Sequence, residues 1–233
     1  MNFLFDFDGT LIDSTSAIVT SFKETIEHFN LKPEKDIKSF IGSPLDLVYE
    51  QLGVERFRMN EVLHYYRERY RSRFLSETKL LDSAKAAILE AFKHGSLALV
   101  TTKTTPRTLD LLDHLGIARY FKVVIGREDT TQAKPSAEPV LRALCKLYNY
   151  DFGSSFSEDF ARSFLDEEEP RWREISFMIG DTTNDIQAGI NAGIIPVATL
   201  FDYQDKSLLE PLTGNITNNV LEAVILSLSL SAK

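Results

Sequence analysis

Two aspartates one residue apart end an apolar run at the start of the chain, in the sequence Asn2-Phe-Leu-Phe-Asp6-Phe-Asp8. A second acidic pair, Asp181 and Asp185, follows the apolar run Ile175-Ser-Phe-Met-Ile179 near the other end. Short, continuous apolar runs are typical of buried parallel strands, and ligands bind at the edge of the sheet where such strands end. We therefore expect the four carboxylates to come together at that edge.

Four carboxylates in one small space repel one another, and burying an unpaired charge costs free energy. A hard divalent cation with oxygen ligands relieves both problems. The acidic pairs therefore predict a metal site, and Mg²⁺ is the ion we expect there.

The composition is that of an ordinary globular protein, with 43% hydrophobic and 26% charged residues in a chain of 233. The net charge of −8 argues against nucleic acid or an anionic membrane as the main partner, because both need a positive surface. Cys145 is the single cysteine, which excludes an internal disulfide and fits a reducing compartment. With no secretory leader and no long apolar run, we expect a soluble cytoplasmic protein.

Short apolar runs alternate with helical patterns along most of the chain. The apolar runs, which we predict to be strands, occupy residues 2–5, 96–100, 122–125, 175–179 and 194–200. Helical patterns lie between them at residues 83–94, 106–115 and 137–148. This alternation predicts the α/β class, with a Rossmann-like, doubly wound parallel sheet.

Residues 14–81 interrupt the alternation. Their apolar residues recur at the spacing of amphipathic helices, which we predict at 15–30, 45–52 and 62–74. A helical block of this length after the first strand is best explained as an inserted all-helical cap domain. We therefore predict a cap domain over residues 14–81 and an α/β core domain over residues 1–13 and 82–233.

The acidic aromatic segment, residues 151–173, holds seven acidic residues against three arginines. Its four phenylalanines stand four residues apart, which predicts one helix with an apolar stripe. We interpret it as an acidic surface element packed on the core domain, with a partner-binding or dimerisation role as the alternative.

Four motifs follow one another along the chain: Asp6-x-Asp8-Gly9-Thr10, Thr101 at the end of an apolar run, Lys134-Pro135, and Gly180-Asp181-x-x-x-Asp185. In these motifs the chain resembles the haloacid dehalogenase superfamily, in particular its phosphoglycolate-phosphatase-like members with a helical cap. The resemblance covers nearly the whole chain. It implies a haloacid-dehalogenase-type α/β core and an enzyme that hydrolyses phosphate esters.

By this resemblance Asp6 is the nucleophile, which takes the phosphoryl group and forms an aspartyl-phosphate. Asp8 protonates the departing alkoxide and then deprotonates the water that attacks the intermediate. Thr101 donates a hydroxyl hydrogen bond to the phosphoryl oxygens, and Lys134 neutralises charge on the phosphoryl group and on Asp6. These four residues are the expected catalytic set.

The expected Mg²⁺ ligands are Asp6 and Asp181, and by resemblance the backbone carbonyl of Asp8 completes the set. Asp185 is expected to hold Lys134 or a metal-bound water.

The expected substrate contacts come from both domains. Gly9 permits a tight turn that lets backbone N–H groups face the phosphoryl oxygens. Thr102 stands where many relatives carry Asn, at the edge of the substrate. In the cap, residues 40–45 resemble the loop that selects the leaving group, with Gly42 and Ser43 as the expected contacts, and an ordinary turn between two helices is the alternative.

The leading hypothesis is a Mg²⁺-dependent phosphatase acting on a small phosphorylated metabolite, either phosphoglycolate-like or a sugar phosphate. The first alternative is a β-phosphoglucomutase-like phosphotransferase, but Thr10 stands where those relatives usually carry Val, which favours hydrolysis. The second is a non-enzymatic binding protein on the same fold, to which the acidic aromatic segment would contribute. Neither the physiological substrate nor the oligomeric state follows from the sequence.

Overall fold

The computed structural model describes residues 1–34, 36–41, 43–200 and 206–231. The chain forms two compact units. The sheet unit comprises Met1–Ile12 and Leu80–Lys233, and the helical unit comprises Asp13–Lys79. The helical unit is thus an insertion that follows the first strand of the sheet unit.

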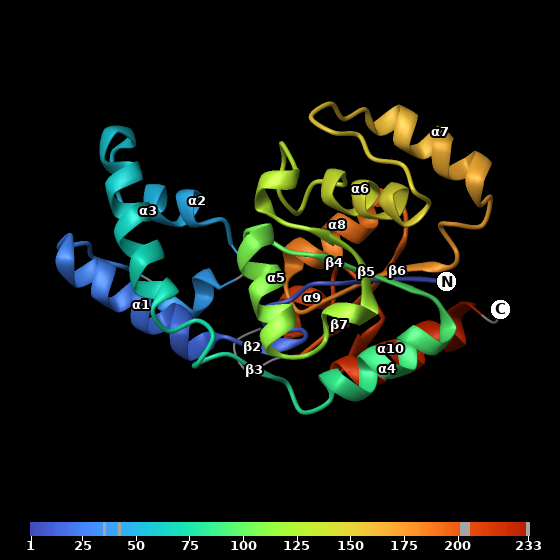
Figure 1. The fold of residues 1–233 in the computed structure, drawn as a ribbon, viewed down its shortest axis with the longest axis horizontal. Helices are drawn as coiled ribbons and strands as arrows, with labels where there is room; N and C mark the ends of the chain where they lie inside the picture. The colour runs from blue at the N-terminus through green and yellow to red at the C-terminus, as the bar shows by residue number, and fades with distance from the viewer. Residues whose placement is uncertain (35, 42, 201–205, 232–233) are drawn as a thin grey trace. The chain divides into compact units, whose positions relative to one another are not determined.

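Six parallel strands form the sheet, in the order β5-β4-β1-β6-β7-β8 (Figure 1). Their bounds are β1 Asn2–Phe5, β4 Ser96–Val100, β5 Phe121–Ile125, β6 Ser176–Gly180, β7 Ile195–Thr199 and β8 Ile216–Thr217. Every residue of β1 and β6 is buried, which explains why both strands are continuous apolar runs. The chain proceeds from β1 towards one edge and then towards the other, so the doubly wound α/β fold is confirmed.

Helices cover both faces of this sheet (Figure 1). Helices α6 (Glu138–Leu147) and α8 (Thr183–Ala192) lie on one face, and α4 (Ala84–His94) and α10 (Val220–Ser231) pack together on the other. The sheet unit also contains α5 Thr105–His114, α7 Glu158–Glu168 and α9 Lys206–Leu209. Within the described residues, no helix combines the length and the apolar character that crossing a membrane requires.

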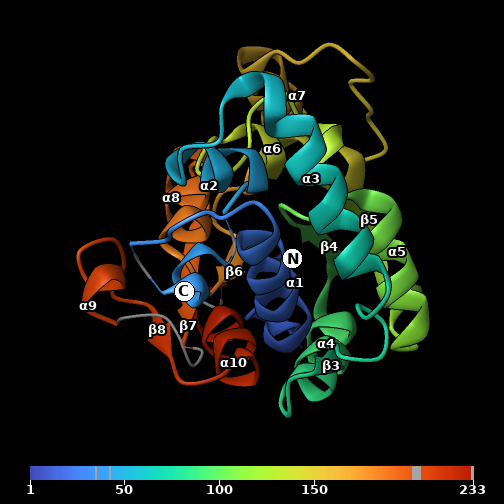
Figure 2. The same ribbon diagram turned by 90° about the vertical axis from the view of Figure 1, so that its left-hand side faces the viewer.

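Three helices pack together in the helical unit (Figure 2). Aromatic rings from all three form its core, since the ring centre of Phe22 lies 5.4 Å from that of Tyr49 and 4.9 Å from that of Tyr66. The elements are α1 Thr15–His28, α2 Leu45–Gln51 and α3 Arg56–Arg71, with the short paired strands β2 Ile12–Asp13 and β3 Lys79–Leu80 at the junction of the two units.

The third of these helices begins earlier than predicted. We expected a helix over residues 62–74, whereas α3 spans Arg56–Arg71. The first turn is largely polar, and its Phe57 is 80% exposed, so the buried apolar stripe starts only at Val62. Apart from the acidic aromatic segment, the other predicted helices and strands begin and end within two residues of the observed bounds.

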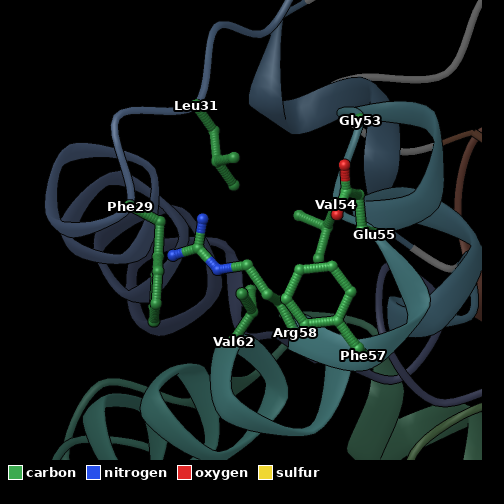
Figure 3. Close-up of a pocket in the computed structure, with 8 residues that line it drawn as sticks. All are labelled: Phe29, Leu31, Gly53, Val54, Glu55, Phe57, Arg58 and Val62. Carbon is green, nitrogen blue, oxygen red and sulfur yellow. The ribbon is translucent and has the colours of Figure 1, made fainter.

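A cavity of about 220 Å³ lies in the helical unit, between the end of α1 and the start of α3 (Figure 3). Apolar side chains such as Phe29 and Val54 line it, and the guanidinium of Arg58 reaches in, 5.5 Å from the ring centre of Phe29. One carboxylate, Glu55, also belongs to the lining. These groups do not form a set suited to phosphoryl chemistry.

The acidic aromatic segment is helical only in part, which corrects the prediction of one continuous helix. Helix α7 spans Glu158–Glu168, whereas Phe152 and Phe156 precede it. Ser157 begins the helix, because its side chain accepts a hydrogen bond from the backbone N–H of Phe160. The rings nevertheless gather, with the ring centre of Phe152 5.0 Å from that of Phe156 and 6.0 Å from that of Phe160. Tertiary packing, and not a shared helix face, brings the phenylalanines together.

Candidate active site

Strand pairing brings three of the predicted site residues to one edge of the sheet. Strand β1 lies between β4 and β6 and pairs with both in parallel. Asp6, Thr101 and Asp181 are the first residues after these three strands. The backbone N–H of Asp6 donates to the carbonyl of Ile179 at 2.9 Å, which continues the pairing into the site. The three side chains therefore start from neighbouring points at the carboxyl edge of the sheet.

Three carboxylates and one ammonium form the centre of the site. Asp6, Asp181 and Asp185 each place a carboxylate oxygen within 4.8 Å of the others, and all three residues are buried. Lys134 Nζ donates to Asp6 Oδ1 at 2.5 Å and to Asp185 Oδ1 at 2.6 Å. The same nitrogen donates to the backbone carbonyl of Val100 at 2.9 Å. One buried ammonium thus faces three buried carboxylates.

Burial, together with the neighbouring charges, shifts the pKa values of the cluster. Burial raises the pKa of Asp6 to about 7, against the opposing effect of Lys134 and with a further rise from Asp185. Burial also raises the pKa of Asp181, and the Asp185 and Asp6 carboxylates add to the rise. For Lys134, burial acts to lower the pKa, but the two neighbouring carboxylates outweigh it and raise the pKa. Asp6 and Asp181 therefore ionise less readily than free aspartates unless more positive charge is brought next to them.

One oxygen of Asp181 is left without a partner. Thr10 Oγ1 donates to Asp181 Oδ1 at 2.9 Å and so orients the carboxylate. Asp181 Oδ2 is buried and accepts no hydrogen bond from any described residue. A buried oxygen in this state is unfavourable unless a ligand meets it. A divalent cation with oxygen ligands fits both this atom and the negative cluster, so the residues present suit the expected Mg²⁺.

The start of α8 places Asp185. The side chain of Thr182 accepts a hydrogen bond from the Asp185 backbone N–H at 3.3 Å, and the Thr182 backbone N–H donates to Asp185 Oδ2 at 2.9 Å. Gly180 leaves the space that this turn needs, because a Cβ at that position would lie 2.3 Å from the Asp185 Cβ. The turn directs the other Asp185 oxygen to Lys134, one of the two partners expected from the sequence.

We expected Asp8 to join the other three carboxylates, but it is not part of their cluster and instead lies beside the ammonium of Lys103. Lys103 Nζ is 3.1 Å from Asp8 Oδ2, and the two side chains are only 9% and 10% exposed. Gly9 follows with a φ of 83°, a left-handed conformation that favours glycine. The expected role of the Asp8 backbone carbonyl as a metal ligand stays a prediction.

The other predicted contacts to the phosphoryl group and the substrate are divided between the loop after β4 and the helical unit. Thr101 is buried, and its Oγ1 accepts a hydrogen bond from the backbone N–H of Lys103 at 3.1 Å. Thr102 is partly buried in the same loop. Ser43 belongs to the helical unit, and Gly42 lies outside the described residues.

Two residues of the site were given no contact from the sequence: Lys103, and Thr10, which was identified only as part of the first motif. Lys103 comes three residues after Val100, where the predicted strand ends, so its position at the carboxyl edge of the sheet could have been predicted. The bond from Thr10 to Asp181 could not have been predicted in this way, because it joins residues from opposite ends of the chain.

The family model described as haloacid dehalogenase-like hydrolase matches residues 3–199. The chain belongs to this family. Pyrophosphatase PpaX from Bacillus velezensis is 30% identical over 224 residues, covering 90% of this chain and 92% of that protein. A phosphoglycolate phosphatase from Aquifex aeolicus is 29% identical over 204 residues, covering 86% of this chain and 84% of that protein.

The fold of this haloacid dehalogenase-like hydrolase is also similar to that of solved structures. A haloacid dehalogenase-like family hydrolase from Streptococcus pneumoniae superimposes with a TM-score of 0.74 at 23% identity, over 97% of each chain. The family and the fold expected from the sequence are thus confirmed.

Proposed function

We propose that this protein is a Mg²⁺-dependent phosphatase that hydrolyses a small organic phosphate monoester through an aspartyl-phosphate intermediate. The observation that carries the proposal is the buried set of Asp6, Asp181 and Lys134 at the carboxyl edge of the sheet. These residues offer a nucleophile, a carboxylate for the cation and a fixed positive charge. Relatives that match most of the chain are named phosphatase and pyrophosphatase, which supports phosphoryl chemistry.

In the first step, Asp6 attacks the phosphorus atom of the substrate. Lys134 holds Asp6 Oδ1, so Oδ2 is the proposed attacking atom. The bond from phosphorus to the leaving oxygen breaks as the bond to Asp6 forms, and Asp8 gives its proton to the leaving alkoxide. Lys134 and the hydroxyl of Thr101 stabilise the negative charge on the phosphoryl oxygens.

In the second step, water hydrolyses the aspartyl-phosphate. Asp8, now a carboxylate, takes a proton from the water as the water oxygen attacks phosphorus. The bond between phosphorus and Asp6 breaks, which releases inorganic phosphate and restores the Asp6 carboxylate. The turn at Gly9 is proposed to present backbone N–H groups to the phosphoryl oxygens in both steps. Mg²⁺, bound by Asp6, Asp181 and the Asp8 carbonyl, would supply further positive charge.

The charge beside Asp8 favours a leaving group that is itself negative. Because Asp8 protonates the leaving oxygen, the leaving group must lie next to it, and Lys103 Nζ is 3.1 Å from Asp8 Oδ2. An ammonium so close attracts a carboxylate or a phosphate on the leaving group. Phosphoglycolate and diphosphate both have such a leaving group, whereas a sugar departs as a neutral alcohol. We therefore propose a phosphoglycolate-like monoester ahead of a sugar phosphate, with diphosphate, an anhydride whose leaving group is phosphate, as a further candidate.

The cytoplasm is the proposed location, since the single cysteine, Cys145, is a buried thiol and suits a reducing compartment. The helical unit is proposed to select the leaving group, as predicted for a cap, with Gly42 and Ser43 as its contacts.

The test is the release of inorganic phosphate by the purified protein from phosphoglycolate, diphosphate and sugar phosphates. We expect release that requires Mg²⁺ and stops with EDTA or with Asp6→Asn, which keeps the shape of the side chain but removes the nucleophile. Turnover that persists in either case contradicts the mechanism. Conversion of one sugar phosphate isomer into another without phosphate release would instead support the phosphotransferase alternative.

A further inference from the structure

The loop that carries Lys134 is held from both sides by polar contacts, which are partly buried before Lys134 and exposed after it. Residues 131–132 precede Lys134 and contact Glu138, the first residue of α6. Pro135 follows Lys134 and contacts Asn191 in α8. Both sets of contacts continue into the acidic aromatic segment, which the proposed mechanism does not use.

The contacts before Lys134 converge on one carboxylate. Glu138 Oε2 accepts from Thr131 Oγ1 at 2.6 Å and from the backbone N–H of Gln132 at 2.9 Å. Glu138 Oε1 accepts from the Thr131 backbone N–H at 3.1 Å. Glu138 is 3% exposed, and these hydrogen bonds, against the opposing effect of burial, lower its pKa. The backbone just before Lys134 is therefore tied to a buried, ionised side chain.

Arg142 connects this carboxylate to the acidic aromatic segment. Its Nε donates to Glu138 Oε1 at 2.8 Å, and its Nη1 donates to the backbone carbonyl of Gly153 at 3.0 Å. Its guanidinium also lies over two rings of the segment, 4.9 Å from the centre of Phe156 and 5.7 Å from that of Phe152. Arg142 is itself 3% exposed, so the connection is shielded from water.

A second connection reaches the loop after Lys134. Arg162, in α7, donates to the backbone carbonyl of Ala192 at 2.8 Å and to that of Asn191 at 2.7 Å. The side chain of Asn191 donates to the backbone carbonyl of Pro135 at 2.8 Å. Helix α7 thus fixes the end of α8, and the end of α8 fixes the residue that follows Lys134. In Figure 1 α7 lies beside α6, on the side of the sheet where α8 also packs.

We infer that the acidic aromatic segment positions Lys134 for catalysis, through Arg142 and Glu138 on one side of the loop and through Arg162 and Asn191 on the other. This inference rests on the proposed function, in which Lys134 is a catalytic residue. Lys134 Nζ must stay within hydrogen-bond reach of Asp6 while Asp6 attacks, and displacements of about 1 Å in such groups cost up to ~100-fold in rate. Arg142 and Arg162 touch no reacting group, so they are positioning residues.

The first test compares Arg142→Met and Arg162→Met with a control from the same segment. Arg171→Met is the control, because Arg171 is an exposed residue whose guanidinium pairs with Glu174 at 2.9 Å and does not contact the Lys134 loop. We expect kcat to fall ~10- to 100-fold in each of the two test variants, with a smaller change in KM. The control is expected to keep the wild-type values.

The second test observes Lys134 directly and needs no turnover. Its buried ammonium has three acceptors, so its protons should exchange slowly and give a ¹H–¹⁵N signal, assigned as the signal that Lys134→Arg removes. We expect this signal to shift or broaden in both test variants and to stay unchanged in Arg171→Met. If Arg142→Met does not fold, Arg162→Met, whose side chain is 25% exposed in the wild type, carries the test alone.

An unchanged ammonium signal together with an unchanged kcat in a folded Arg162→Met variant would overturn the inference. If the wild-type protein releases no phosphate, the proposed function fails, but the ammonium signal still decides whether the segment positions Lys134. The two failures are therefore distinguishable.

Discussion

Replacing Asp6 by Asn should stabilise the metal-free protein at alkaline pH, although it removes the proposed nucleophile. The change keeps the size of the side chain and leaves the hydrogen bond between Lys134 and Asp185 in place. It removes a carboxyl group whose pKa burial raises to about 7, so that its ionisation at higher pH destabilises the folded protein. The expected gain in stability follows from the sign and the size of this shift.

For an acid whose pKa is higher in the folded state, stability is greatest at low pH and is lost as the pH rises. Below the ordinary value of 3.8, Asp6 is protonated in both states and contributes no difference. Between pH 3.8 and about 7, Asp6 ionises in the unfolded chain but keeps its proton in the folded state, so the stability of the fold decreases as the pH rises. Above about pH 7 Asp6 is ionised in both states and the stability decreases no further. A shift of this size corresponds to about 4 kcal/mol. In a protein of this length, that lowers Tm by roughly 10 °C.

The assay is thermal unfolding of the wild type and Asp6→Asn in EDTA, from pH 5 to pH 8. We expect Tm of the variant to be roughly 10 °C higher than that of the wild type at pH 8. At pH 5 we expect the difference in Tm to be less than half as large. Added Mg²⁺ should raise Tm of the wild type more than that of the variant, because Asp6 is an expected ligand. Asp113→Asn is the control, since Asp113 is exposed and its replacement should not produce this pH dependence.

Two results would refute this reasoning. If wild type and Asp6→Asn show the same dependence of Tm on pH without metal, burial does not raise the pKa of Asp6 in the folded protein. If Mg²⁺ leaves Tm of the wild type unchanged at a concentration that supports activity, the buried carboxylates are not its binding site.

Three further changes test other parts of the site. Lys103→Met should lower kcat/KM for phosphoglycolate ~10- to 100-fold more than for propyl phosphate, which has a neutral leaving group; equal losses on both would contradict leaving-group selection. Thr101→Val, which removes only the hydroxyl, should lower kcat/KM ~10-fold, and unchanged kinetics would exclude the proposed hydrogen bond. Gly180→Ala should lower stability by about 1–3 kcal/mol and abolish activity, because its Cβ would force Asp185 away. Gly214→Ala is the matched control, since its Cβ would meet no atom within 4 Å, and similar damage there would contradict the steric argument.

Features that depend on neighbouring residues could be predicted from the sequence. Continuous apolar runs identified the buried strands, and the residues that follow them, Asp6, Thr101 and Asp181, were assigned to one edge of a parallel sheet. The predicted helix boundaries were less accurate where the spacing of apolar residues does not follow the helix that forms. The first turn of α3 is polar and half of the acidic aromatic segment is not helical, so periodicity misplaced the boundaries in both.

Contacts between distant residues were decided only by the tertiary structure. The sequence pattern indicated that carboxylates meet at the edge of the sheet. It did not indicate that the Thr10 hydroxyl donates to one oxygen of Asp181, nor that the other oxygen is buried without a partner among the described residues. It placed Lys103 just after a predicted strand but did not indicate that the Lys103 ammonium pairs with Asp8. Such contacts require that the loops after different strands close on one another within about 3 Å, and this depends on strand pairing and loop geometry together. The sequence therefore determined which residue types reach the edge of the sheet, and the folded chain determined which atoms face one another there.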